Sequence, residues 1–455
     1  MGIMMEATNF ILILILLGLC LAMLATGIRR KGLIYEFPFF AGAIFFSFVL
    51  PQLPGLALDP HLPEAAFAKT MVVTLSCAAL TWLGWSVSDQ PMRHLSWEMN
   101  ERRLITAAVF LSLAGAFFFF QISRLPEDVK GASLYTGLPV AYLFFAKLLN
   151  YGFALAVICF VRTRSRVALA TAAFGALFYV DRIVFAGRRG DTSELILLIL
   201  LALWFQRGIA VPRMLPLAGV LAATLVMAST GDYRTVATTE EGPSIEQVTQ
   251  IDFVGNLKYL MVNGGPEMRN AVYKINAIDE NMILDFGAFH WNTLVFNFIP
   301  AQLVGAEFKG LFSIPVDNPY EFTSHLPMTG STETGMADAF GSFWYFGAVK
   351  FLLIALVLNR YYRSAMLGCI PAQLFYMLLL TPGMHSITHH THFVLTSWVH
   401  LTIFLIPVLM WARVPGRRAA GAGHIRSAGP HAGTGRAGTG QIPVPSVLTP
   451  AGQRN

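Results

Sequence analysis

A dense group of charges lies between two apolar runs near the middle of the chain. Three arginines and three acids fall between Asp181 and Glu194, including the doublet Arg188-Arg189 next to Gly190. Arginine suits planar, multidentate recognition of phosphate, and glycine lets backbone approach a ligand closely. The pattern therefore predicts a turn that binds a phosphate or pyrophosphate group. The alternative is a tight turn whose charges, which sum to zero, only pair with one another.

Two carboxylates, Glu333 and Asp338, lie where the chain enters a later apolar run. A carboxylate at that position can orient a hydroxyl group or accept its proton. The structural alternative is a helix start that Ser331 or Thr332 caps, with Glu333 complementing the helix dipole. The sequence leaves both interpretations open.

Four histidines fall within eight residues: His385, His389, His390 and His392. Positions 385 and 389 would share one face of a helix. Metal ligation, a role as general base or phosphate partner, and a polar loop without catalytic duty all remain open. The spacing also resembles one histidine box of membrane desaturases. Those di-iron enzymes need several such boxes, so we expect no di-iron site here. Of the open roles we favour those that need neither a metal nor a cofactor.

A long polar segment separates the charged turn from the two carboxylates. Asp232 and Arg234 stand at its start. Apolar residues between Ile245 and Val262 recur at helical spacing, which predicts a helix lying along the membrane surface. The segment from Trp291 to Leu303 is almost wholly apolar but too short to cross, and Pro300 would break it. We expect an interfacial or re-entrant segment there, with a simple amphipathic lid as the alternative for both.

The elements that position these residues are apolar helices. Hydrophobic residues make up 55% of the 455 residues, and charged residues only 13%. A helix needs about 20 apolar residues to cross a hydrocarbon core, and it satisfies its own backbone there. We therefore predict an all-α polytopic membrane protein with about eleven transmembrane helices. They lie near residues 8–28, 33–50, 66–87, 104–123, 135–161, 167–186, 192–211, 214–229, 335–358, 365–381 and 393–411.

Basic residues crowd the connections after every odd-numbered span, which predicts the orientation. By the positive-inside rule these connections are cytoplasmic, so the N-terminus lies outside and the C-terminus inside. The turn near Arg188 and one long loop between helices 8 and 9 then lie on the extracytoplasmic side. This loop runs from Ser229 to Gly335, about 105 residues.

The chain thus divides into four parts. Residues 1–229 hold the first eight spans, 230–334 the extracytoplasmic loop with amphipathic or re-entrant helices, and 335–411 the last three spans. The remainder, 412–455, is rich in Gly, Ala and Pro and predicts a disordered basic cytoplasmic tail. From Arg413 onward it holds six arginines and no acid, which accounts for the whole net charge of +6. The charge therefore gives no reason to expect a nucleic-acid partner.

Three segments resemble bacterial O-antigen polymerases and ligases. The stretch from Phe185 to Asp191 resembles their "(S/R)-R-G" signature, with Arg188-Arg189 in place of the commoner Ser-Arg. The segment from Phe296 to Pro300 resembles the "F-I-P-R" motif of oligosaccharide repeat-unit (Wzy-type) polymerases. The segment from Gly330 to Gly347 resembles an element that begins a late helix in the same family. The resemblance covers about 180 residues, from Asp181 to Arg363.

The resemblance departs from the family pattern after Pro300. Ala301 stands where the family often has arginine, and Arg269 or Lys309 is the expected replacement. The resemblance otherwise implies a helical, metal-independent glycosyltransferase of a bacterial inner (plasma) membrane. Its substrate would be an oligosaccharide linked through pyrophosphate to a polyprenyl carrier, and its partners membrane lipids and a chain-length regulator protein.

The implied reaction is polymerisation of repeat units into O-antigen, capsule or exopolysaccharide on the periplasmic face. It proceeds by inverting displacement, with lipid pyrophosphate as the leaving group. Cations must stabilise the growing negative charge, and the candidates are Arg188, Arg189, Arg234 and Arg269. A base must take the proton of the acceptor hydroxyl, and the candidates are Glu333, Asp338 and His389.

Three other functions remain as alternatives. An O-antigen ligase would use the same chemistry on another acceptor. A membrane acyltransferase that modifies glycans would use one of the clustered histidines as a base. A transporter of lipid-linked glycans would have charges distributed through its spans, whereas here they gather at the outer ends.

Overall fold

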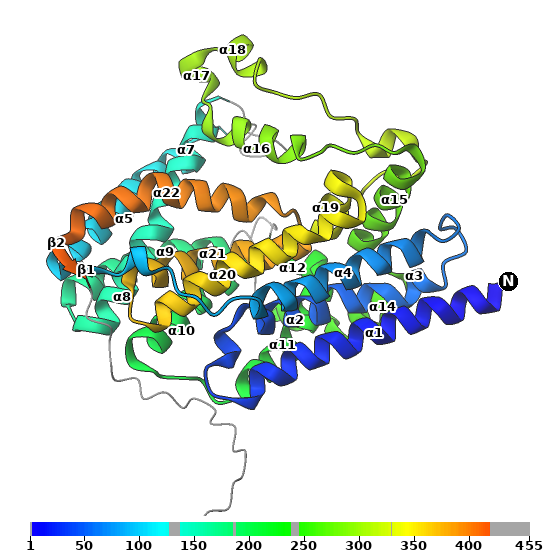
Figure 1. Cartoon of the computed structure of the whole chain (residues 1–455), viewed down its shortest axis with the longest axis horizontal. Helices are drawn as coiled ribbons and strands as arrows, with labels where there is room; N and C mark the ends of the chain where they lie inside the picture. The colour runs from blue at the N-terminus through cyan, green and yellow to red at the C-terminus, as the bar shows by residue number, and fades with distance from the viewer. Residues whose placement is uncertain (1, 127–136, 185–187, 238–244, 329, 419–455) are drawn as a thin grey trace, which may run out of the picture. The chain divides into compact units, whose positions relative to one another are not determined.

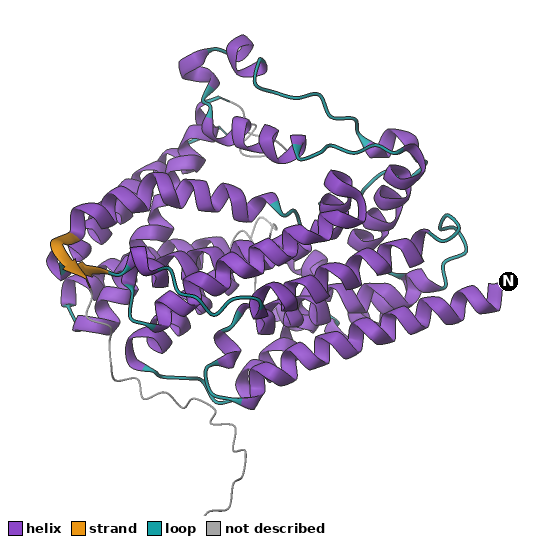
Figure 2. Cartoon of the chain, in the orientation of Figure 1, coloured by secondary structure: helices purple, strands orange, loops and turns teal. Residues whose placement is uncertain are grey.

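The computed structural model describes residues 2–126, 137–184, 188–237, 245–328 and 330–418. These residues pack as one unit, which is almost entirely helical (Figures 1 and 2). The prediction of a helical protein with several membrane-crossing segments is confirmed. Among the described residues, eight helical segments are long and apolar enough to cross a membrane.

Five of these segments are continuous helices or nearly so, and three contain a local break. The continuous ones are α1 (Gly2–Arg29), α4 (Ala66–Ser86), α5 (Glu101–Ser123), α9 (Arg166–Val184) and α22 (His392–Ala412). The second segment joins α2 (Phe37–Ile44), the π-helical η2 (Phe45–Val49), η3 (Leu50–Gln52) and α3 (Leu53–Ala57). The other two broken segments are α7 (Leu138–Ala146) with α8 (Leu148–Thr163), and α19 (Gly335–Phe343) with η6 (Trp344–Ala348) and α20 (Val349–Met366).

Three further predicted spans are helices, but they are not among these eight segments. They are α10 (Arg189–Arg207), α11 (Met214–Ala228) and α21 (Ile370–Thr388). α11 is apolar but short. α10 begins with charged residues, and α21 ends in a polar stretch after Pro382. α21 is buried along nearly its whole length and packs against α2, α10, α20 and α22, so it forms the centre of the helix bundle.

One pair of strands departs from the all-α prediction. β1 (Trp97–Met99) follows η4 (Arg93–Leu95) and pairs antiparallel with β2 (Arg413–Arg418). The Asn100 N–H also donates to the Ala412 carbonyl at 2.8 Å. The prediction of a disordered tail from residue 412 is therefore wrong for its first residues, because backbone pairing with β1 orders them. The rest of that predicted tail, from residue 419, lies outside the described residues.

The predicted loop at 230–334 consists largely of short helices. They are α12 (Thr230–Ala237), α13 (Ile245–Thr249), α14 (Phe253–Asn263), α15 (Pro266–Asn281), α16 (Ala288–Phe298), α17 (Ala301–Val304), α18 (Ala306–Gly310) and η5 (Pro319–Phe322). The helix predicted over Ile245 to Val262 is broken, because Asp252 caps a new helix by accepting from the Gly255 N–H at 2.8 Å. The break predicted at Pro300 is confirmed.

The glycines of the Gly330 to Gly347 segment serve close packing. A methyl group on Gly335 would overlap the backbone carbonyl oxygen of Ser386, which lies in α21. A methyl group on Gly347 would overlap the carbonyl oxygen of Ala339 in the same way. The Gly335 contact holds the start of α19 against α21, about one turn before Asp338, and the Gly347 contact packs η6 against α19.

We expect Gly335→Ala to destabilise the protein by at least about 3 kcal/mol, because two packed backbones would have to separate. Gly219→Ala is the matched control, since a methyl group there meets no atom within 4 Å. The measurement is the temperature of unfolding of each purified variant in detergent. Equal unfolding temperatures for the two variants would contradict this account of the packing.

Candidate functional site

The four clustered histidines divide between two polar sites. α21 ends at Thr388, and α22 begins at His392, so the chain turns sharply between them. His385 and His389 face one site, which also contains Arg188. His390 and His392 lie on the other side, against Phe289, with ring centroids 5.3 and 5.4 Å from its ring. A single short segment therefore contributes to both sites.

The first site, the arginine pocket, is a cavity of about 320 Å³. Its polar wall consists of Arg188, Asp191, Ser193, Glu194, His385, Thr388 and His389. The Arg188 side chain is exposed, and its backbone caps the start of α10. Gly190 packs closely against this wall, since a Cβ at its position would lie 3.0 Å from the His385 ring. The predicted phosphate-binding turn thus lies beside two of the clustered histidines.

Several of the neighbouring charges pair with one another, as the structural alternative predicted. Arg182 lies 3.3 Å from the Asp191 carboxylate and 3.4 Å from the side-chain oxygen of Asn150. The amide nitrogen of Asn150 donates to Glu194 at 3.2 Å. Arg182 also lies over the ring of Tyr179, 4.7 Å from its centroid. This network braces the ends of α8, α9 and α10 behind the pocket, and the charge of Arg188 also interacts with the Asp191 carboxylate.

The second site, the Asp338 cluster, is built around a carboxylate whose side chain is only 2% exposed. Its Oδ2 accepts hydrogen bonds from the Thr391 N–H at 2.7 Å and from the Thr391 hydroxyl at 2.5 Å. The Thr391 hydroxyl is also 2.8 Å from Nε2 of His290. Lys350 Nζ lies 3.9 Å from the other carboxylate oxygen and donates to the Ser342 hydroxyl at 2.6 Å.

These hydrogen bonds define the protonation of His290. The Thr391 hydroxyl has one proton, with which it donates a hydrogen bond to the Asp338 carboxylate, so it must accept a hydrogen bond from the Nε2–H of His290. Burial lowers the pKa of His290 below its usual value of 6.5, and the Asp338 carboxylate opposes this without reversing it. His290 is therefore a neutral donor at neutral pH, and with Thr391 it fixes the orientation of the carboxylate.

His390 and His392 extend the cluster. Their rings stack with centroids 5.3 Å apart. Burial lowers the pKa of His390, so this ring is also neutral at neutral pH. Both Nδ1 atoms are buried and have no hydrogen-bond partner among the described residues. Two unused acceptor or donor positions therefore lie beside the Asp338 carboxylate.

A cavity of about 790 Å³ leads to the Asp338 carboxylate. It lies between α15, α16, the chain at 314–319 and the start of α19. Glu333 lines it and forms an ion pair with Lys274 of α15. The predicted cap at Ser331 or Thr332 is wrong. α19 begins after Thr334, and the Ser331 hydroxyl instead bonds the Met328 carbonyl at 2.6 Å.

The structure brings together some of the predicted residues and separates others. Arg188 and His389 share the arginine pocket, whereas Glu333 and Asp338 share the larger cavity. Arg269 forms an ion pair with Asp59, away from both sites. Lys309, the other candidate to replace a family arginine, donates to the Phe296 carbonyl at 3.0 Å.

Two candidate arginines cannot be placed. The side chains of Arg189 and Arg234 lie outside the part of the chain that the structure describes.

Sequence reasoning missed the partners of Asp338. His290 stands alone in the sequence, Thr391 lies unremarked between two of the clustered histidines, and Lys350 is a single charge within an apolar run. An ionisable residue at membrane depth was the available signal for Lys350, since such residues are costly unless they serve a function. Among the described side chains, no group of three or more His, Cys, Asp or Glu residues is arranged to hold a metal ion.

Comparison of this chain with family models, with curated proteins and with solved structures finds no match. The arguments about function therefore depend on the two sites themselves.

Proposed function

We propose that this protein transfers glycosyl groups from a polyprenyl-pyrophosphate-linked oligosaccharide to a sugar hydroxyl, and so polymerises repeat units into a surface polysaccharide. The observation that carries the proposal is the segment from His385 to His392. One end of it lines the arginine pocket, and the other bonds the Asp338 carboxylate. Glycosyl transfer from a pyrophosphate requires a cation for the leaving group and a carboxylate that can accept a proton, and this segment contributes to the site of each.

The proposed reaction divides between the two sites. The acceptor hydroxyl oxygen forms a bond to the anomeric carbon, and the bond from that carbon to the pyrophosphate oxygen breaks. The electron pair of the broken bond leaves with the lipid pyrophosphate, where Arg188 and the neighbouring histidines stabilise its charge. The proton of the acceptor hydroxyl goes to Asp338, the catalytic base. Thr391 and His290 are positioning residues for that carboxylate.

The proposal also includes the topology, with about eleven spans, the N-terminus outside and the C-terminus in the cytoplasm of a bacterial inner membrane. It requires α9 to cross the bilayer. α9 has 19 residues, and at about 1.5 Å per residue its length is close to a hydrocarbon core of about 30 Å. Arg166, the first residue of α9, and Arg188, just beyond the other end of the helix, are both exposed.

We expect Arg188→Cys to react with a membrane-impermeant maleimide in intact cells, and Arg166→Cys to react only after the membrane is opened. The background is low because the four native cysteines are buried. Labelled protein can be quantified after affinity purification. Protection of Arg188→Cys in intact cells would place the arginine pocket in the cytoplasm and overturn the proposal.

Surface polysaccharide from a clean deletion strain tests the function itself. If the protein is the polymerase, the ladder of polysaccharide chain lengths should collapse to one repeat unit on the lipid carrier. If the protein is a ligase, its deletion should instead leave an undecorated acceptor and accumulated long chains. If it is an acyltransferase, deletion should remove only an ester substituent from the polysaccharide. A normal ladder would contradict the proposal.

A further inference from the structure

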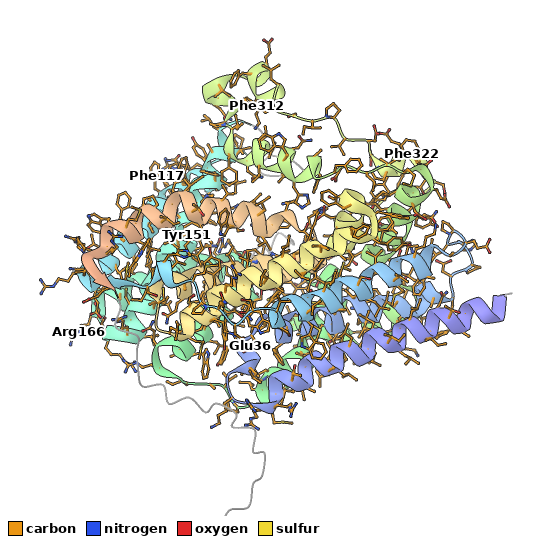
Figure 3. The ribbon with its side chains drawn as sticks, in the orientation of Figure 1. Glu36, Phe117, Tyr151, Arg166, Phe312 and Phe322 are labelled. Atoms are coloured by element: carbon orange, nitrogen blue, oxygen red, sulfur yellow. The ribbon has the colours of Figure 1, made fainter. Side chains whose placement is uncertain are left out.

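One wall of the cavity at Asp338 is formed by an extended segment of chain, which we call the strap. After α18 the chain returns over α16 through residues 311–318 (Figure 1). Trp291 and Asn292 of α16 hold this strap. Trp291 Nε1 donates to the Phe312 carbonyl at 2.7 Å, and Asn292 exchanges two hydrogen bonds with Ile314, at 2.7 and 2.8 Å. Figure 3 labels Phe312, near the start of the strap, and Phe322, in η5 beyond its end.

The lining of this cavity suits sugar rings. Phe286, Phe289 and Trp291 contribute aromatic faces to its wall. The C–H groups on one face of a pyranose carry weak positive charge, and they stack on the negative face of an aromatic ring. Asn318 and the acidic side chains add groups that can bond hydroxyls. A volume of about 790 Å³ also lies within the range of small-molecule sites, about 300–1,000 Å³.

Negatively charged side chains outnumber positively charged ones in the lining of this cavity. Four carboxylates line the cavity, from Asp285, Asp317, Glu333 and Asp338, against one cation, Lys274. Lys274 is already paired with Glu333. Even when Lys350 behind Asp338 is included, carboxylates outnumber cations by four to two. A ligand with a carboxylate would meet like charges at close range within a largely apolar wall, where such repulsion is poorly screened.

We infer that this cavity binds the acceptor end of the growing glycan, and that it selects an acceptor sugar without an acidic group. The inference rests on the proposed glycosyl transfer for the role of its ligand. It adds a substrate class: neutral or amine-bearing oligosaccharides are accepted, and those ending in a uronic acid are rejected. The negative charge of the cavity disfavours acidic sugars, and its aromatic wall provides the affinity for the glycan.

A pair of soluble tetrasaccharides that differ only at C6 of the non-reducing sugar, CH₂OH against carboxylate, tests the inference. Binding to the purified full-length protein in detergent is measured by calorimetry. We expect the neutral glycan to bind at least tenfold more tightly. The double variant Asp285→Asn and Asp317→Asn should narrow this ratio, because asparagine keeps the shape and the side-chain oxygen. Asp89→Asn, which removes an 81% exposed carboxylate outside the cavity lining, should leave it unchanged.

Equal binding of the two glycans, tighter binding of the acidic one, or no binding of either would overturn the inference. Trp291→Phe should weaken binding of the neutral glycan, since it narrows the aromatic surface and removes the hydrogen bond that holds the strap. The proposed function is read out separately, by consumption of a polyprenyl-pyrophosphate oligosaccharide. Consumption of that donor together with failed glycan selection would therefore overturn only the cavity inference.

Discussion

Asp338→Asn is expected to lower the rate of glycan polymerisation by about 10²–10⁴-fold, the usual contribution of a general base. Asparagine preserves the size of the side chain and one acceptor oxygen, but it cannot take the acceptor proton. The Thr391 hydroxyl and N–H, both bonded to Oδ2, would also lose their charged partner. The measurement is the rate of elongation of a polyprenyl-linked repeat unit by the purified variant.

Glu333→Gln is the matched control for Asp338→Asn. Glu333 lines the same cavity, but its side chain is 27% exposed and pairs with Lys274, so we expect a much smaller loss. Thr391→Val should lower the rate as well, and Thr391→Ser should restore most of it, because serine keeps the hydroxyl. If Asp338→Asn polymerised glycan at the wild-type rate while folded, the base would have to be another residue.

Arg188→Ala is expected to lower kcat by about 10²–10³-fold, as loss of one transition-state donor does in other enzymes. Negative charge on the leaving pyrophosphate grows during bond cleavage, so kcat should fall more than KM rises. Arg188→Lys should lose less, because lysine keeps the charge but not the planar fork. The measurement is steady-state kinetics with a synthetic lipid-pyrophosphate donor.

Two other arginines provide the controls for Arg188. Arg166 is exposed at the opposite end of α9, as its first residue, and Arg166→Ala should leave the kinetics unchanged. Arg182 belongs to the structural network with Asp191, so Arg182→Ala should lower the unfolding temperature as well as the activity. Wild-type kinetics for Arg188→Ala would remove the arginine pocket from the mechanism.

The sequence predicted the parts of the fold that depend on composition and local breaks. Apolar runs identify most of the long helices, because only a helix satisfies its backbone in lipid. Pro300 marks a true helix end, since proline removes a donor and clashes with the preceding turn. The strand Arg413–Arg418 was not predictable, because the strand it pairs with among the described residues has three residues and lies more than 300 residues earlier.

The site shows the same division between local and distant information. The pairing of charges around Arg182 follows from their neighbourhood in the sequence. The division of the four histidines between two sites could not be predicted from the sequence, because it depends on the turn after Thr388, where α21 ends. The link between His290 and Asp338 joins a short helix of the loop to the start of a later one, and no sequence pattern connects them.

Reconstitution of the purified protein into liposomes with a polyprenyl-pyrophosphate oligosaccharide tests the central claim most directly. The claim is that the arginine pocket and the Asp338 cluster act together on one donor. Wild-type protein should release polyprenyl pyrophosphate and form products of two or more repeat units, whereas Arg188→Ala and Asp338→Asn should each form almost none. Elongation that both folded variants support at the wild-type rate would contradict the account.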